Sequence, residues 1–172
     1  MPAEEQVAWL FAYGSLMGDA TLRRYPPRPA RLPGYHRAFL HESRRRWGTP
    51  EHPCPILGLA PGDDCWGLAF EIPEAEARTA RSTIEKREAV AERRLETHAA
   101  ETPQGTVPAW VWVSREPRRT AADDLAAVET RLRAAHGTVG NGVEYVRSLV
   151  HAMQPHGLHD PLVDALWTRL RG

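Results

Sequence analysis

The 172-residue sequence has few cysteines, no excess charge of either sign and no long hydrophobic run. Its two cysteines, Cys54 and Cys65, are too few for a disulfide scaffold and lack the paired spacing of a metal site. Because Lys+Arg and Asp+Glu both number 22, the charge gives no reason to expect binding to nucleic acid or to an anionic membrane. The longest apolar run, residues 7–13, is far shorter than the ~18 residues of a membrane span. No signal peptide opens the chain, so we expect a cytoplasmic protein. We expect it to bind neither nucleic acid nor a membrane.

Motifs for a metal or a nucleotide cofactor are also missing. The sequence has no Walker loop, no dinucleotide fingerprint and no Cys-x-x-Cys pair. His151, His156 and His159 could form a metal cluster, but no carboxylate pattern of a metalloprotease accompanies them. Residues 155–157 are typical of a turn between helices, which favours solvated surface histidines instead. We therefore expect no metal and no cofactor.

The length and the 42% hydrophobic content predict a single domain over residues 1–172. Short apolar runs bounded by turn residues predict strands at residues 7–13, 31–40, 56–60, 66–72 and 106–114. Helical spacing predicts helices at residues 74 to about 100, 121–136, from 141 onward and 160–167. Thr120 and Gly137 are the expected caps of the second helix, and Asn141 with Glu144 forms a capping pair for the third. Strands followed by helices indicate an α+β protein.

Glu88 is the most informative single residue. It follows Ile84 by four residues and precedes Ala91 by three, so it projects from the face that the apolar residues bury. Burial raises the pKa of a carboxyl group, which is how a general base is adjusted for work near neutral pH. The alternative is a structural ion pair with Arg87 or Arg93, or a place at the edge of the core.

Three further features permit both a functional and a structural interpretation. The segment Tyr13-Gly14-Ser15-Leu16 follows the first strand, where glycine lets the backbone approach a ligand, or it is an ordinary turn. Residues 44–46 are three consecutive arginines, which favours a solvated loop but also suits an anionic pocket. Tyr145, near a helix start, is either a core aromatic or a hydroxyl presented to a site.

Taken together, these pieces resemble the ChaC-type γ-glutamylcyclotransferases. The resemblance runs in order along nearly the whole chain. It is carried by residues 9–17, with the Tyr-Gly-Ser-Leu loop, and by residues 32–39, 48–53, 66–70, 86–88 and 140–146.

The resemblance implies a small mixed β-barrel flanked by helices and release of a γ-glutamyl group as 5-oxoproline, without any cofactor. It implies that Glu88 is the proton acceptor. It also implies a small-molecule substrate, glutathione or another γ-glutamyl compound, bound by Ala12, Tyr13, Gly14, Ser15, Leu16, Met17 and Tyr145. Finally, it implies a strand near residues 93–100, so we expect the helix that begins at Glu74 to end near Val90.

The sequence departs from the family pattern at Trp47, at residues 89–94 and at residues 114–120. These departures concern the pocket for the leaving group. Two alternatives therefore stay open: a cyclotransferase for a different γ-glutamyl amine or amino acid, and a non-catalytic module that binds γ-glutamyl metabolites. The sequence gives no oligomeric state.

Overall fold

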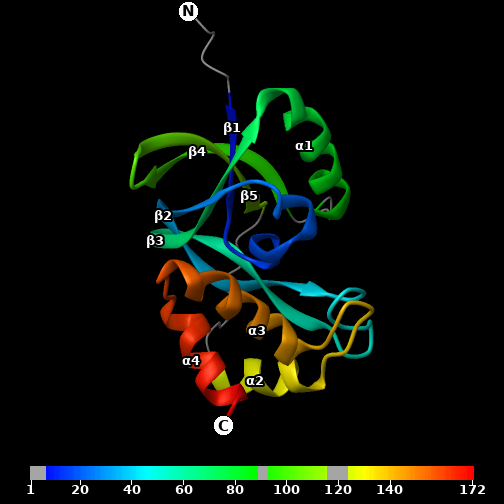
Figure 1. Ribbon diagram of the computed structural model, residues 1–172. Coiled ribbons are helices and arrows are strands. Elements are labelled where there is room, and N and C mark those ends of the chain that lie inside the picture. Colours follow the sequence, from blue (N-terminus) through cyan, green and yellow to red (C-terminus); the bar gives the residue numbers. More distant parts are fainter. Residues whose placement is uncertain (1–6, 89–92, 116–123) are drawn as a thin grey trace, which may run out of the picture.

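The computed structural model describes residues 7–88, 93–115 and 124–172, and its centre is a closed five-stranded barrel (Figure 1). The strands follow one another around the barrel in the order β1-β3-β2-β4-β5. Neighbouring strands are antiparallel except β1 and β5, which are parallel. The mixed β-barrel expected from the resemblance is thus confirmed. The strands are β1 (Val7–Ala12), β2 (Pro27–Ser43), β3 (Cys54–Pro73), β4 (Arg93–Thr102) and β5 (Gly105–Ser114).

The two long strands β2 and β3 differ from the prediction. The strands expected at residues 56–60 and 66–72 are parts of the single strand β3. The residues between them, 61–65, do not end the strand. Gly62 and Asp63 do adopt positive φ angles of 107° and 54°, but they lie beside a register shift opposite residues 33–35 of β2. A bulge absorbs such residues without ending the pairing.

The helix α1 (Glu74–Glu88) ends where the resemblance, and not the helical spacing, placed its end. Spacing alone extended it to about residue 100, which is wrong because residues 93–102 pair along their length with β5. The apolar face that contains Ile84 is buried, as predicted: Ala77, Ala80 and Ile84 are 5%, 4% and 3% exposed. The barrel therefore decides the conformation of a segment whose composition also suits a helix.

The remaining helices are α2 (Leu125–Ala134), α3 (Gly142–Met153) and α4 (Pro161–Leu170). The predicted caps of α2 are wrong: Asp124 caps its start by accepting from the N–H groups of Ala126 and Ala127, and Ala135 follows its end. Thr120 lies outside the described residues. The capping pair of α3 is confirmed, because Asn141 accepts from Glu144 N at 2.9 Å and donates to its carboxylate at 2.9 Å.

Two apolar clusters hold the fold together, and alternation along the strands separates them. In β1, Trp9 and Phe11 belong to one cluster, while Leu10 and Ala12 belong to the other, larger one. The larger cluster includes buried residues of α3 and α4. Helices α2, α3 and α4 gather at the end of the molecule that holds the C-terminus, and α1 lies beside the barrel away from them (Figure 1). Among the described residues, no helix has the length and hydropathy to cross a membrane.

Candidate functional site

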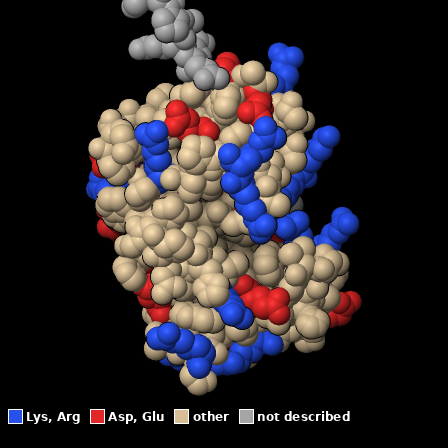
Figure 2. Space-filling view, in the orientation of Figure 1, with Lys and Arg blue, Asp and Glu red and all other residues tan. Residues whose placement is uncertain are grey.

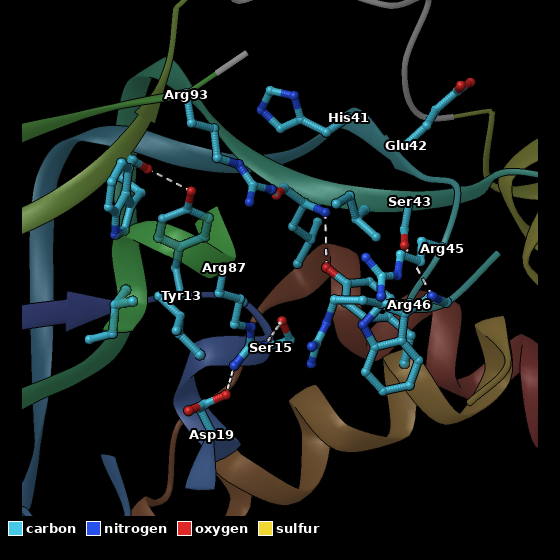
Figure 3. Close-up of a pocket in the computed structure, with 18 of the residues that line it drawn as sticks. Tyr13, Ser15, Asp19, His41, Glu42, Ser43, Arg45, Arg46, Arg87 and Arg93 are labelled. Atoms are coloured by element: carbon cyan, nitrogen blue, oxygen red, sulfur yellow. Dashed lines mark hydrogen bonds and ion pairs between the residues drawn. The ribbon is translucent and has the colours of Figure 1, made fainter. Parts of the chain in front are cut away.

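A cavity of about 600 Å³ lies where several segments converge: the turn after β1, the end of α1, the loop after β2, and Tyr145 of α3 (Figure 3). Its volume is in the range of small-molecule sites. Tyr13, Gly14, Ser15 and Leu16 line it, together with Tyr145. Ala12 and Met17, which the resemblance also assigned to substrate, are 1% and 6% exposed and pack into the core behind the turn. The cavity therefore brings together five of the seven expected binding residues.

The turn after β1 is held firmly. The Tyr13 hydroxyl donates to the backbone oxygen of Trp112 at 2.6 Å, and Arg37 Nε donates to the Tyr13 carbonyl at 2.8 Å. Residues Ser15–Gly18 form the short 3₁₀ helix η1. In the described part of the chain, the N–H groups of Ser15 and Leu16 have no protein acceptor. Their dipoles are thus available to a ligand with an accepting oxygen.

The end of α1 is tied to this turn by Arg87. Its guanidinium donates to Ser15 Oγ at 2.9 Å and forms an ion pair with Asp19, as Figure 3 shows. Ile84 and Lys86 also line the cavity. Glu88 is the last residue of α1, and its side chain lies outside the described part of the structure. Its expected catalytic role stays a prediction, as does the alternative of an ion pair with Arg87 or Arg93.

The cavity is rich in positive charge, which gathers beside the hollow at mid-height in Figure 2. Among the described residues, the acidic groups that line it are Asp19 and Glu42, and both are already paired. The hydrogen bond from Arg131 is the main cause that lowers the pKa of Glu42. The site therefore favours an anionic ligand. The basic residues that line it are Arg44, Arg45, Arg46, Lys86, Arg87 and Arg93.

Tyr145 is both a core aromatic and a wall of the cavity. It is 2% exposed, and its hydroxyl accepts from Leu57 N at 3.0 Å. Burial raises the pKa of this phenol, so it remains protonated. Trp47, where the sequence departs from the family pattern, packs on Tyr145 with ring centroids 5.4 Å apart and lines the cavity. This departure thus lies in the wall of the site itself.

A histidine and a serine form a second buried polar group. His41 Nε2 lies 2.7 Å from Ser114 Oγ, and the two residues are 8% and 6% exposed. A side chain at Gly58 would collide with both, so glycine makes room for the pair. His41 lines the cavity, while Ser114 packs behind it at the end of β5. The rest of the departing segment 114–120, beyond residue 115, lies outside the described residues.

An arginine in β2 supports the site from behind. Arg37, whose side chain is 1% exposed, forms a 3.0 Å ion pair with Asp160 and donates to the carbonyls of Tyr13 and Trp66 at 2.8 and 2.6 Å. Asp160 also caps α4 through the N–H groups of Leu162 and Val163. Arg37 thus joins the turn after β1, the strand β3 and the helix α4.

Sequence reasoning missed Asp19, Arg37 and His41 as parts of this region, and it named Arg93 only as an alternative ion-pair partner of Glu88. Arg37 gives no local signal, because its partner Asp160 is 123 residues away in the chain. The three arginines at 44–46, for which a solvated loop was the favoured interpretation, line the cavity.

Neither cysteine has the environment of a reactive thiol. Both are buried, and burial raises the pKa of Cys54 to about 12 and that of Cys65 to about 11. His159 contacts Asp164 at 3.3 Å, and both His151 and His159 are exposed. Within residues 7–88, 93–115 and 124–172, no three His, Cys, Asp or Glu side chains are grouped to hold a metal ion.

Comparison with known proteins identifies similar sequences and a similar fold. The family model described as ChaC-like protein matches residues 8–171. A glutathione-specific γ-glutamylcyclotransferase of Escherichia coli K12 is 30% identical over 169 residues, which cover 93% of this chain and 73% of that enzyme. The glutathione-specific γ-glutamylcyclotransferase 1 of Danio rerio is 26% identical over 154 residues, covering 85% and 79%. A crystal structure of a yeast γ-glutamyl cyclotransferase specific to glutathione superposes with a TM-score of 0.82 at 18% identity, covering 96% of both chains.

Proposed function

Because this chain belongs to the ChaC-like protein family, we propose that it is a γ-glutamylcyclotransferase that cleaves glutathione, or a related γ-glutamyl peptide, to 5-oxoproline and the released amine. The observation that carries the proposal is the basic cavity between the turn at Ser15 and the end of α1. Glutathione carries two carboxylates and one ammonium group near neutral pH, so a cavity with unpaired basic residues suits it.

The reaction needs little machinery, because the substrate contains its own nucleophile. The α-amino group of a γ-glutamyl amide reaches the γ-carbonyl through a five-membered ring, and such tethering supplies several kcal/mol through effective molarity. The amine has a pKa of roughly 8, so it is protonated at neutral pH and must first lose a proton. No metal, nucleotide or redox group enters this route.

We assign the proton transfer to Glu88. Ile84, one helical turn earlier, lines the cavity, and residues four apart share a face of a helix. Glu88 takes the proton from the α-amino group and returns it to the departing amine. The N–H groups of Ser15 and Leu16 are placed to stabilise the charge that develops on the carbonyl oxygen. Tyr145 and the Arg87–Ser15 contact shape the walls around the substrate.

The activity is tested by incubating the purified protein with glutathione and measuring 5-oxoproline and Cys-Gly by mass spectrometry. We expect both products in equal amounts. Release of 5-oxoproline only from another γ-glutamyl amine or amino acid would show that this compound, and not glutathione, is the substrate. Binding of glutathione without either product would indicate a non-catalytic module. The cytoplasmic location stays a prediction, to be checked by cell fractionation.

Gly14 provides a direct test of the turn. It lines the cavity, and a Cβ added there meets no protein atom within 4 Å, so Gly14→Val is expected to fold and to place its side chain in the substrate's space. We expect kcat/KM for glutathione to fall at least about tenfold, the equivalent of ~1.4 kcal/mol of lost binding.

The matched control is Gly18→Val, at the far end of the short helix η1 that begins directly after Gly14. Gly18 also has open space around its Cβ but is exposed and does not line the cavity. Steady-state kinetics of both variants, with circular dichroism to confirm folding, decide the point. If Gly14→Val and the parent protein have equal kinetics, this turn does not contact the substrate.

A further inference from the structure

The arginines on the two sides of the cavity differ in their contacts. On one side, Arg87 is engaged by Ser15 and Asp19, whereas Arg45 and Arg46 lie on the other side, in the loop after β2 (Figure 3). Among the described residues, neither Arg45 nor Arg46 has an acidic partner or any hydrogen bond from its side chain. Their neighbour Arg44 is paired with Glu42 at 3.3 Å. Two unpaired guanidinium groups therefore face the cavity from the loop.

The backbone of this loop is clamped in place. Thr138 N donates to Arg45 O and Val139 N donates to Arg46 O, both at 2.8 Å. Gly137 allows this close approach, because a Cβ there would collide with the backbone of Arg46 and Trp47. The points from which the two arginine side chains extend are thus fixed by the segment between α2 and α3.

The far side of the same loop is fixed as well. Trp47 N donates to Ser43 Oγ at 3.0 Å, and the Trp47 ring packs on Tyr145. A loop that is only solvated does not require so many fixed contacts. These contacts reduce the entropy that the arginines lose when they engage an anion, and guanidinium groups match carboxylates in geometry as well as charge.

We infer that Arg45 and Arg46 bind a carboxylate on the leaving half of the substrate. This inference rests on the proposed function, because it assumes that the γ-glutamyl half occupies the side of the cavity formed by the Ser15 turn and α1. The preferred substrates are then γ-glutamyl peptides and γ-glutamyl amino acids, whose leaving amine carries a carboxylate. Simple γ-glutamyl amines, which lack that charge, are poor substrates.

The experiment compares glutathione with the analogue whose glycine carboxylate is replaced by an uncharged amide. Binding is measured by calorimetry in protein that carries Glu88→Gln, so that the ligands stay intact. We expect glutathione to bind about 10- to 100-fold more tightly than the amide, as one or two charged hydrogen bonds provide. Arg46→Gln and Arg45→Gln are each expected to reduce this preference, and together to abolish it, with little change in amide binding.

Arg147→Gln is the matched control, because Arg147 is exposed on α3, does not line the cavity and changes the net charge equally. It should keep the full preference. Equal binding of the two ligands, no binding of either, or equal weakening of both by Arg46→Gln would overturn the inference. Turnover of glutathione by the protein with Glu88 intact is measured separately. A carboxylate preference without turnover would retain the inference and reject the proposed activity.

Discussion

Replacing Glu88 with glutamine is expected to abolish the release of 5-oxoproline while leaving the protein folded. Glutamine keeps the shape and most of the hydrogen-bonding capacity of glutamate, but it cannot accept the proton of the α-amino group. A general base typically contributes ~10²–10⁴-fold to the rate. Because the same group also returns the proton to the leaving amine, we expect a loss at the upper end of that range.

Stability should not fall with this loss of activity. Groups that serve catalysis commonly cost folding free energy, so the neutral isostere of Glu88 is expected to melt at the same temperature or higher. Turnover and thermal melting are therefore measured on the same sample. The residual rate of the variant should also lack the acidic limb that a titrating base gives to the pH profile of kcat/KM.

Glu85→Gln is the control on the same helix. Glu85 pairs with Arg81 at 3.2 Å, and both side chains are well exposed, so its removal should change stability by less than about 0.5 kcal/mol and leave turnover intact. Full activity in folded Glu88→Gln protein would reject the base. Lost activity with a collapsed melting transition would instead support the structural ion pair that the sequence also allowed.

Features that depend on short stretches of sequence were predicted well. The capping pair at Asn141, the buried face of α1 and the strand ending in the Tyr13 turn are all set by neighbours within a few residues. The end of α1 is different, because alanine and glutamate continue the helical composition past Glu88. Only pairing with β5 makes residues 93–102 a strand, and the resemblance supplied what local spacing could not.

The candidate site divides in the same way. Glycine after a strand is a local signal that predicts the turn at Gly14 and Ser15, while its place in a binding site came from the resemblance; the cavity does form there. For the three arginines of the opposite side the sequence left a solvated loop and an anionic pocket open, and it favoured the loop because three arginines in a row are usual there. Their position depends on contacts with Thr138 and Val139, about 90 residues later in the sequence. Charge patterns alone carry no information about such contacts.

Arg37→Met is expected to destabilise the protein by about 3–5 kcal/mol. The substitution keeps much of the apolar stem but leaves Asp160 without its cationic partner and the carbonyls of Tyr13 and Trp66 without their donor. Urea unfolding measures the loss. Arg31→Met, in the same strand, is the control: the Arg31 pairs with Asp64 and Glu101 are open to solvent, so we expect a much smaller loss of stability than for Arg37→Met.

Asp160→Asn separates the ion pair from the helix cap. Asparagine is as good an N-cap as aspartate, so α4 keeps its capping bonds while the charge opposite Arg37 is removed. We expect this variant to fold and to lose stability, though less than Arg37→Met, because Arg37 keeps its two carbonyl acceptors. In the Asp160→Asn protein the turn after β1 should remain in place, and kcat/KM should change little.

Arg37→Met, which frees the Tyr13 carbonyl, should also raise KM in whatever protein remains folded. Equal kinetics in both variants would mean that Arg37 stabilises the fold without positioning the turn.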